Sequence, residues 1–308
     1  MIDVVFATHN GARTLPLMLE RMELLRSPSR GWRILAVDNG STDNTRAVLE
    51  SFQTRLPLSI HTHAAPGKNA ALNSVIASAT ADLIVLTDDD ILPEPDWLVQ
   101  YERIATEQRS FHIFGGSITP EWMIQPPSWI YQYQEFFGVC YGITHGGHCK
   151  GEIAPNLIWG ANMMLRRSIF EQGHLFDAKR GPKSGTQYVM GSETELTRRL
   201  VAAGFRCYFD PKPSVRHLIR PEQLRRYWML KRAYRLGLAQ GANAKAQRDS
   251  ANCINYFGAP RFLYRQFVQA LGKSIGWAIL FHFERAFRSQ WDVFRLAGVI
   301  RQYRQGCP

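Results

Sequence analysis

Residues 83–90 read Leu-Ile-Val-Leu-Thr-Asp-Asp-Asp, so a short apolar run leads directly into three consecutive carboxylates. An apolar run of this length, bounded by polar residues, predicts a strand that is buried on both faces. Adjacent carboxylates repel one another and resist removal from water unless a cation neutralises them. Mg²⁺ and Mn²⁺ bind carboxylate oxygens and often bridge them to substrate phosphates. A solvated acidic turn is the simpler interpretation of the triplet alone, so the rest of the chain decides between the two.

Strands and helices alternate at close spacing in the first hundred residues, which predicts a parallel α/β sheet. The predicted strands are residues 2–8, 34–38, 58–61 and 83–86. Ligands of such sheets bind at the carboxyl ends of the strands, where Thr8, Asp38 and the acidic triplet lie. The Gly-rich phosphate fingerprints of dinucleotide oxidoreductases and P-loop enzymes do not follow the first strand. We therefore expect a nucleotide-diphosphate pocket of another kind.

The net charge of +11 is unevenly placed along the 308 residues. Residues 1–211 hold 19 Lys and Arg against 22 Asp and Glu, whereas residues 212–308 hold 18 against 4. After Pro260 the chain looks helical, with apolar positions on roughly one side and Arg and Lys between them. Such basic amphipathic helices either lie in a membrane interface or pack on the rest of the protein, and the sequence favours neither.

The cysteine pattern and the hydrophobic runs bear on the compartment. The five cysteines are odd in number and match no disulfide framework, so we expect reduced thiols. A strand predicted from residue 2 leaves no room for a signal peptide, and the most apolar stretch, residues 275–283, is too short to span a bilayer. We expect a cytoplasmic protein, with a peripheral position on the cytoplasmic face of the membrane as a further expectation.

Six motifs in the chain resemble, in their order and residues, those of the family 2 glycosyltransferases. The resemblance extends over about three quarters of the chain. Its motifs are Thr8-His9-Asn10, Val37-Asp38-Asn39-Gly40-Ser41-Thr42-Asp43, Gly67-Lys68-Asn69-Ala70-Ala71-Leu72-Asn73, Thr87-Asp88-Asp89-Asp90, Trp159-Gly160-Ala161-Asn162-Met163-Met164-Leu165-Arg166-Arg167 and Gly191-Ser192-Glu193-Thr194-Glu195-Leu196. The resemblance implies the GT-A fold, a Rossmann-like mainly parallel sheet flanked by helices. It also implies transfer of a sugar from a nucleoside diphosphate with inversion.

The resemblance also implies site residues. Asp38 corresponds to the aspartate that holds the nucleobase or ribose, and Asp88 and Asp90 fit the metal-binding Asp-x-Asp motif, with Mn²⁺ or Mg²⁺ as the metal. The run of three aspartates leaves the register open, with Asp89 and Asp90 as the other choice. His217 corresponds to a histidine that is often a further metal ligand.

The catalytic base of the family is usually Asp in a Gly-Glu-Asp-x-Glu-Leu pattern, from which this chain departs. Aligning Glu195 with the last Glu makes Glu193 the base, and Glu195 remains the competing candidate. The residues themselves agree, since Ser192 and Glu195 form a capping-box pattern that predicts a helix start. Glu193 then lies in the first turn, where the helix dipole favours an ionised carboxylate able to accept a proton. A plain helix-start carboxylate is the alternative role.

Other parts of the donor site are less specific. We place Thr8 and Asn10 at the nucleotide sugar, together with Asp38, Lys68 and Asp88. Arg166 and Arg167 are further candidates for the diphosphate. Aromatic residues between positions 122 and 149 suit either a sugar platform or core packing.

Together these features predict a GT-A catalytic domain over residues 1–220 and a basic amphipathic helical extension over residues 221–308. Residues 1–115 form the nucleotide-sugar half and residues 116–220 the acceptor half. The expected enzyme is an inverting, metal-dependent hexosyltransferase that moves one sugar to a saccharide or lipid-linked acceptor. Its expected setting is cell-surface polysaccharide or glycolipid synthesis, with contact to an anionic membrane and none to nucleic acid. The alternatives are a sugar-1-phosphate nucleotidyltransferase and a non-catalytic basic membrane-binding module.

Overall fold

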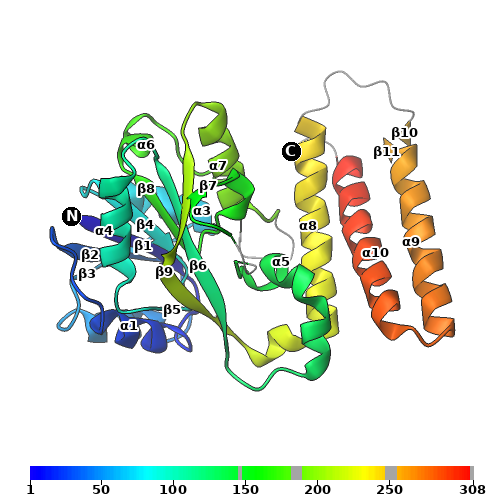
Figure 1. Cartoon of the computed structure of the whole chain (residues 1–308), viewed down its shortest axis with the longest axis horizontal. Coiled ribbons are helices and arrows are strands. Elements are labelled where there is room, and N and C mark those ends of the chain that lie inside the picture. Colours follow the sequence, from blue (N-terminus) through cyan, green and yellow to red (C-terminus); the bar gives the residue numbers. More distant parts are fainter. Residues whose placement is uncertain (145–147, 182–188, 247–254, 306–308) are drawn as a thin grey trace. The chain divides into compact units, whose positions relative to one another are not determined.

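The computed structural model describes residues 1–144, 148–181, 189–246 and 255–305 of the chain. The chain divides into two compact units (Figure 1). The first, here called the sheet unit, consists of Met1–Met123, Tyr141–Ser184 and Ser192–Ile219. The second, the helical unit, consists of Ile124–Cys140, Gly185–Gly191 and Arg220–Pro308.

The sheet unit is built on a mixed sheet that is mostly parallel in its N-terminal part. The strand order is β3-β2-β1-β4-β8-β6-β9-β5, and β7 pairs with β9. The bounds are β1 (Ile2–Thr8), β2 (Trp32–Asp38), β3 (Leu58–Thr62), β4 (Leu83–Thr87), β5 (Ile91–Pro93), β6 (Ile113–Trp122), β7 (Gly151–Glu152), β8 (Asn162–Arg166) and β9 (Cys207–Ile219). The first four strands are parallel, which confirms the prediction for this region, and β8 joins β4 in the antiparallel sense.

Helices flank this sheet and bury both of its faces. They are α1 (Leu15–Glu23), α2 (Thr45–Phe52), α3 (Lys68–Ile76), α4 (Trp97–Glu107), α6 (Ser168–Glu171) and α7 (Ser192–Ala202). Alternate residues of β1 enter opposite cores: Val4 and Phe6 pack with α1 and α4, whereas Val5 packs with α3. Every residue of β4 is buried, as its apolar run predicts. Every residue of β1 is buried as well, including Asp3, whose carboxylate pairs with Arg33.

The register of the sheet brings polar strand ends together. Thr8 of β1 is level with Asp38 of β2, and Asp38 is level with Thr62 of β3. Farther across the sheet, β5 pairs with β9 so that Ile91 is opposite His217. The residue before Ile91 is Asp90, so this pairing brings the acidic triplet close to a histidine that lies more than 120 residues later.

The helical unit contains η1 (Ser128–Phe136), η3 (Pro221–Leu224) and three long helices, α8 (Arg226–Ala246), α9 (Arg261–Ile279) and α10 (Phe283–Arg304). The short α5 (Phe137–Tyr141) follows η1, and β10 (Asn255–Tyr256) pairs with β11 (Ala259–Pro260). The three long helices lie side by side (Figure 1). Helices α8 and α10 touch through Gly237 and Gly298, where an added Cβ at Gly298 would lie 2.9 Å from the Leu238 nitrogen.

Aromatic residues of η1 pack on α10 within the helical unit. The rings of Phe136 and Trp291 stack at 4.0 Å, and the rings of Tyr133 and Phe287 lie 4.6 Å apart. On the surface beside these rings, Arg288 Nε donates a hydrogen bond to Glu135 Oε1 at 2.7 Å. Core packing therefore accounts for Tyr133 and Phe136, two of the aromatic residues for which a sugar platform was the alternative.

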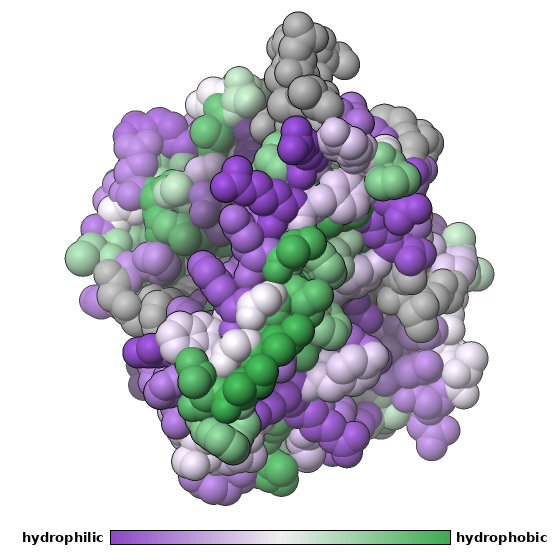
Figure 2. All heavy atoms as spheres, turned by 90° about the vertical axis from the view of Figure 1, so that its right-hand side faces the viewer, coloured by the Kyte–Doolittle hydropathy of each residue, from purple (hydrophilic) through white to green (hydrophobic). Residues whose placement is uncertain are grey.

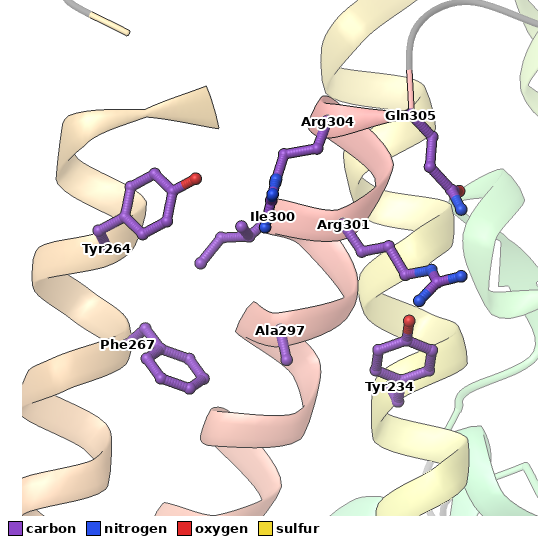
Figure 3. Close-up of a pocket in the computed structure, with 8 residues that line it drawn as sticks. All are labelled: Tyr234, Tyr264, Phe267, Ala297, Ile300, Arg301, Arg304 and Gln305. Atoms are coloured by element: carbon purple, nitrogen blue, oxygen red, sulfur yellow. The ribbon is translucent and has the colours of Figure 1, made fainter. Parts of the chain in front are cut away.

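A pocket of about 670 Å³ lies among the three long helices (Figure 3). Its lining residues are Tyr234, Tyr264, Phe267, Ala297, Ile300, Arg301, Arg304 and Gln305. None of the predicted site residues lines it. Among the described residues, no helix combines the length and apolar character needed to cross a membrane.

Candidate active site

Three potential metal ligands meet at the carboxyl end of β4. One ligand atom from each of Asp88, Asp90 and His217 lies within 4.8 Å of the others. The Nε2 atom of His217 is 2.9 Å from Asp90 Oδ1, and its Nδ1 hydrogen bonds to the Tyr141 carbonyl. Because a carbonyl only accepts, Nδ1 is the donor, and Nε2 faces the carboxylates. Such a backbone partner on the second nitrogen is what orients metal-binding histidines.

The chemistry of this cluster fits a divalent cation. Two carboxylates and an imidazole offer oxygen and nitrogen ligands, a set that Mn²⁺ accepts. Burial alone would lower the pKa of His217, but the neighbouring Asp90 carboxylate raises it to about 9. The imidazolium thus supplies positive charge beside Asp90 in the ion-free protein, and a bound cation would replace that proton.

Asp89 points away from this cluster. Thr8 Oγ1 donates to Asp89 Oδ2 at 2.5 Å, and Gly11 leaves room for the carboxylate, since a Cβ there would lie 2.7 Å from Asp89 Oδ2. Burial and the nearby Asp90 raise the pKa of Asp89 to about 7. Of the two registers that the sequence allows, the structure groups Asp88 with Asp90 and directs Asp89 to β1.

Lys68 connects the acidic cluster to α7. Its ammonium group pairs with the Asp88 carboxylate and lies 3.6 Å from Glu193 Oε1. Burial alone would lower the pKa of Lys68, but the Asp88 and Glu193 carboxylates raise it above its usual value. A permanently charged amine therefore lies between a candidate metal ligand and the candidate base.

Asn39 holds the loop that delivers Lys68. Its side-chain nitrogen donates to the carbonyls of His63 and Ala65, and its oxygen accepts from the Gly67 nitrogen at 3.0 Å. This buried side chain directly follows β2, and it thus holds residues 63–67 beside the end of that strand. Residue 67 immediately precedes Lys68. Sequence reasoning quoted Asn39 within a motif but assigned it no role, and only the Asn-Gly pair signalled a turn.

Glu193 and Glu195 have different surroundings, although both lie in the first turn of α7. Glu193 Oε2 accepts from Ser192 Oγ at 3.0 Å, and its carboxylate lies against Gly160, where an added Cβ would be 2.7 Å from Oε1. Glu195 instead accepts from Arg199, at 2.8 Å, one turn along the helix. The helix begins at Ser192 as predicted, and of the two carboxylates Glu193 is the one that contacts Lys68.

The remaining predicted donor residues tie the first two loops together. The Asn10 side-chain oxygen accepts from the Thr42 nitrogen at 2.8 Å, and Asp38 Oδ1 accepts from the Ser41 nitrogen at 3.0 Å. Asn10 has a φ of 55°, a conformation that Asn tolerates better than most residues. Both side chains lie beside the strand ends that carry Thr8 and the acidic triplet.

Two other candidates point elsewhere. Arg166 donates from Nε to the Phe111 carbonyl at 2.8 Å, and Arg167 pairs with Glu171 at 2.9 Å. Of the three cations proposed for the diphosphate, Lys68 is the one that the structure places at the acidic cluster. Asn162, in the motif that follows Gly160, is buried and accepts from Trp97 at 2.8 Å, so it holds the fold together.

Comparison with known proteins identifies the family of the chain and proteins similar to it. The family model described as "Glycosyl transferase family 2" matches residues 3–173. A glucosyl-dolichyl phosphate glucuronosyltransferase of Haloferax volcanii is 22% identical over 52% of this chain. A probable glycosyltransferase of Bacillus subtilis, YdaM, is 25% identical over 68% of it. The matches span only about half of these curated relatives, 50% and 49% of their lengths.

Solved structures share the fold. Mannosyltransferase PcManGT from Pyrobaculum calidifontis, in complex with GDP-Man and Mn²⁺, has a TM-score of 0.66 at 16% identity, covering 99% of this chain and 88% of its own. S. aureus TarS 1-349 in complex with UDP has a TM-score of 0.54 at 14% identity, covering 99% and 92%. The sheet and its helices are those of the GT-A fold, followed by C-terminal helices.

Proposed function

Because the chain belongs to glycosyl transferase family 2, we propose that it moves one hexosyl group from a nucleoside-diphosphate sugar to a hydroxyl acceptor, with inversion. The observation that carries this proposal is the position of Lys68, which contacts both Asp88 and Glu193. It links the candidate metal ligands and the candidate base into one charged cluster. A non-catalytic binding module would not require this contact between the candidate base and the candidate metal ligands.

We assign the metal site to Asp88, Asp90 and His217, with Mn²⁺ or Mg²⁺ as the ion. Support comes from the ligand types, the orienting carbonyl of Tyr141 and the complex of PcManGT with GDP-Man and Mn²⁺. A bound divalent ion would neutralise charge on the departing nucleoside diphosphate. Lys68 adds a second positive charge. Once a cation occupies Asp88, the ammonium group of Lys68 can contact the diphosphate instead.

Glu193 is the proposed general base. Its carboxylate takes the proton of the acceptor hydroxyl while that oxygen forms a bond to the anomeric carbon. The bond from the anomeric carbon to the phosphate oxygen breaks on the opposite face, and its electron pair leaves with the nucleoside diphosphate. Contact with Ser192 and Lys68 orients the carboxylate before the acceptor arrives.

Thr8, Asn10 and Asp38 complete the proposed donor pocket. Asp38, which is 7% exposed, would hold the nucleobase or ribose, and Asn10 fixes the loop beside it through Thr42. Thr8 fixes Asp89, which keeps the neighbouring aspartates directed at His217. These side chains thus shape the pocket, while Asp88 and Lys68 supply its charge.

We propose a saccharide or lipid-linked acceptor, in cell-surface polysaccharide or glycolipid synthesis. The relatives from Haloferax volcanii and Methanococcus voltae have names that specify dolichyl-linked phosphate compounds. The surplus of Lys and Arg after residue 211 supports a peripheral position at an anionic membrane. Both features favour the proposal of a lipid-linked acceptor over a soluble one.

A screen of nucleoside-diphosphate sugars tests the proposal. With Mn²⁺ present, one donor should be hydrolysed slowly without acceptor and stabilise the protein against heat. Glu193→Gln should lower turnover by about 10² or more, because it keeps the shape of the side chain and removes its basicity. Donor affinity should stay within about twofold.

Glu195→Gln is the matched control, since it changes a neighbouring carboxylate that pairs with Arg199 instead. It should leave turnover near the wild-type value. If Glu195→Gln is inactive while Glu193→Gln turns over normally, the base is assigned to the wrong residue. If no nucleoside-diphosphate sugar binds or is hydrolysed, the proposed reaction is wrong.

A further inference from the structure

The outward face of α9 carries apolar side chains that nothing covers among the described residues (Figure 2). They form a band that we call the α9 ridge: Val268, Leu271, Ile275 and Ile279 of α9, and Leu280 and Phe281 of the turn that follows. Their exposed fractions run from 41% to 79%. Positions 268, 271, 275 and 279 follow the spacing of one helix face, so the exposure is a property of the whole face.

The opposite face of α9 is already used. Leu263 and Ala270 are buried and pack with Leu296, Val299 and Ile300 of α10. The helix is therefore anchored to the helical unit by one side and presents the other to the outside. Helix α9 therefore packs within the helical unit on one face only.

The charges beside the α9 ridge are of one sign. Arg265 and Lys273 lie on exposed positions of α9, which contains no Asp or Glu from Arg261 to Ile279. Neither forms an ion pair within the part of the chain that the structure describes. Near the end of the ridge, the Arg285 guanidinium lies 4.8 Å from the Trp277 ring, and His282 lies 5.5 Å from it.

We propose that the α9 ridge lies in the interface of an anionic lipid bilayer, with α9 parallel to the membrane plane. Apolar side chains would enter the boundary between headgroups and acyl chains, while Arg265 and Lys273 meet lipid phosphates. This rests on the membrane position proposed above and names the surface responsible for it.

A second copy of the chain fits the α9 ridge less well. A twofold dimer would place the same patch on both partners. Since α9 has no acidic residue, its cations would face cations, and no carboxylate of the opposite helix would neutralise them. An anionic lipid surface satisfies the apolar band and the charges together.

The test uses the full chain and two kinds of vesicle, phosphatidylcholine alone and phosphatidylcholine with phosphatidylglycerol. Wild-type protein should sediment with the anionic vesicles at low salt and less well at high salt. Ile275→Glu/Ile279→Glu should lower the partition coefficient by about tenfold or more, because charges would enter the apolar boundary. Arg265→Gln/Lys273→Gln should bind less and lose part of the salt dependence.

The matched control is Leu17→Glu/Leu24→Glu, which adds the same charges to two exposed leucines of the sheet unit. It should sediment like wild type. Thermal unfolding checks that each variant is folded, and hydrolysis of the nucleotide sugar without vesicles checks the reaction separately. A ridge variant that sediments like wild type overturns the proposal. So does a lipid-free wild-type dimer that the ridge variant dissociates.

Discussion

The ammonium group of Lys68 lies 3.6 Å from the Oε1 atom of Glu193. The same ammonium pairs with Asp88, so one cation joins the proposed metal ligand to the proposed base. In the ion-free protein this cation occupies the place beside Asp88 that a divalent ion would share. We therefore expect Lys68 and a bound ion to compete for the same carboxylate until a diphosphate gives Lys68 a new partner.

Replacing Lys68 by Met should separate binding of the ion from binding of the nucleotide. Mn²⁺ alone should bind a few-fold more tightly to Lys68→Met, because the substitution removes a positive charge beside Asp88 that repels the ion. Binding of the nucleoside diphosphate with Mn²⁺ should weaken by about tenfold, or about 1.4 kcal/mol, because a charged contact is lost. Isothermal titration calorimetry measures both affinities.

Lys179→Met serves as the control for the loss of one charge, since Lys179 is an exposed lysine of the same unit. It should change neither affinity beyond about twofold. If Lys68→Met weakens the ion and the nucleotide equally, Lys68 supports the fold of the site and does not compete with the cation.

Gly160→Ala should impair transfer without affecting donor binding. An added Cβ would lie 2.7 Å from Oε1 and 2.8 Å from Cδ of Glu193, which is too close for either atom. The carboxylate must move, and a shift of about 1 Å at a catalytic group can lower turnover by about 10². Steady-state kinetics should show a lower kcat, with the KM for the donor nearly unchanged.

Gly272→Ala is the matched control, because a Cβ at Gly272 meets no atom within 4 Å. Its kcat should equal that of wild type. A Gly160→Ala enzyme with full turnover would mean that the carboxylate of Glu193 does not need its observed position.

Asp210 should make the stability of the sheet unit depend on pH in the acid range. Burial alone would raise its pKa, but hydrogen bonds from the Lys212 nitrogen and from Arg103 hold the pKa below its usual value. The folded state thus binds this proton less readily than the unfolded state. The contribution is present above the unfolded pKa and is lost as the pH falls through the lower, folded pKa.

Asp210→Asn should therefore destabilise the protein by about 3 kcal/mol at pH 7, because it leaves a buried pair without its anion. The difference from wild type should shrink as the pH is lowered below about 4. Urea unfolding at several pH values measures it. Glu107→Gln removes the exposed partner of the same Arg103 and should cost less than about 1 kcal/mol. Equal losses in the two variants would contradict this account.

The strands of the sheet could be predicted because their signals are local. Residues 2–8 are apolar except for Asp3 and the terminal Thr8, and the apolar run of residues 83–86 leads through Thr87 into the acidic triplet. Both strands are confirmed as β1 and β4, and the burial predicted for residues 83–86 is confirmed for β4. The start of α7 at Ser192 could also be predicted, from the capping-box pattern of Ser192 and Glu195. In the structure, however, the Glu195 carboxylate accepts a hydrogen bond from Arg199.

Contacts between distant residues could not be derived from local patterns. His217 reaches Asp90 because β5 and β9 pair with Ile91 opposite His217, a register that no local pattern encodes. The direction of Asp89 depends on Thr8, which is 81 residues earlier. The same holds for Asn39, whose role depends on a loop 24 to 28 residues away.

The roles of the aromatic residues between positions 122 and 149 could not be predicted from the sequence for the same reason. Its residues suited a sugar platform and a core equally well, because composition does not reveal which surface lies opposite. The partners of Tyr133 and Phe136 are Phe287 and Trp291, about 150 residues later in the chain. Only the packing of η1 on α10 decides their role.

The central claim is that donor binding depends on a divalent ion held by Asp88, Asp90 and His217. Calorimetry of GDP and UDP, with and without Mn²⁺, tests it in wild type, in Asp90→Asn and in the control Asp82→Asn, an exposed carboxylate. We expect Mn²⁺ to strengthen binding of one nucleotide by about tenfold or more in wild type and Asp82→Asn, and to have little effect in Asp90→Asn. Equal affinity with and without Mn²⁺ in all three proteins would contradict the claim.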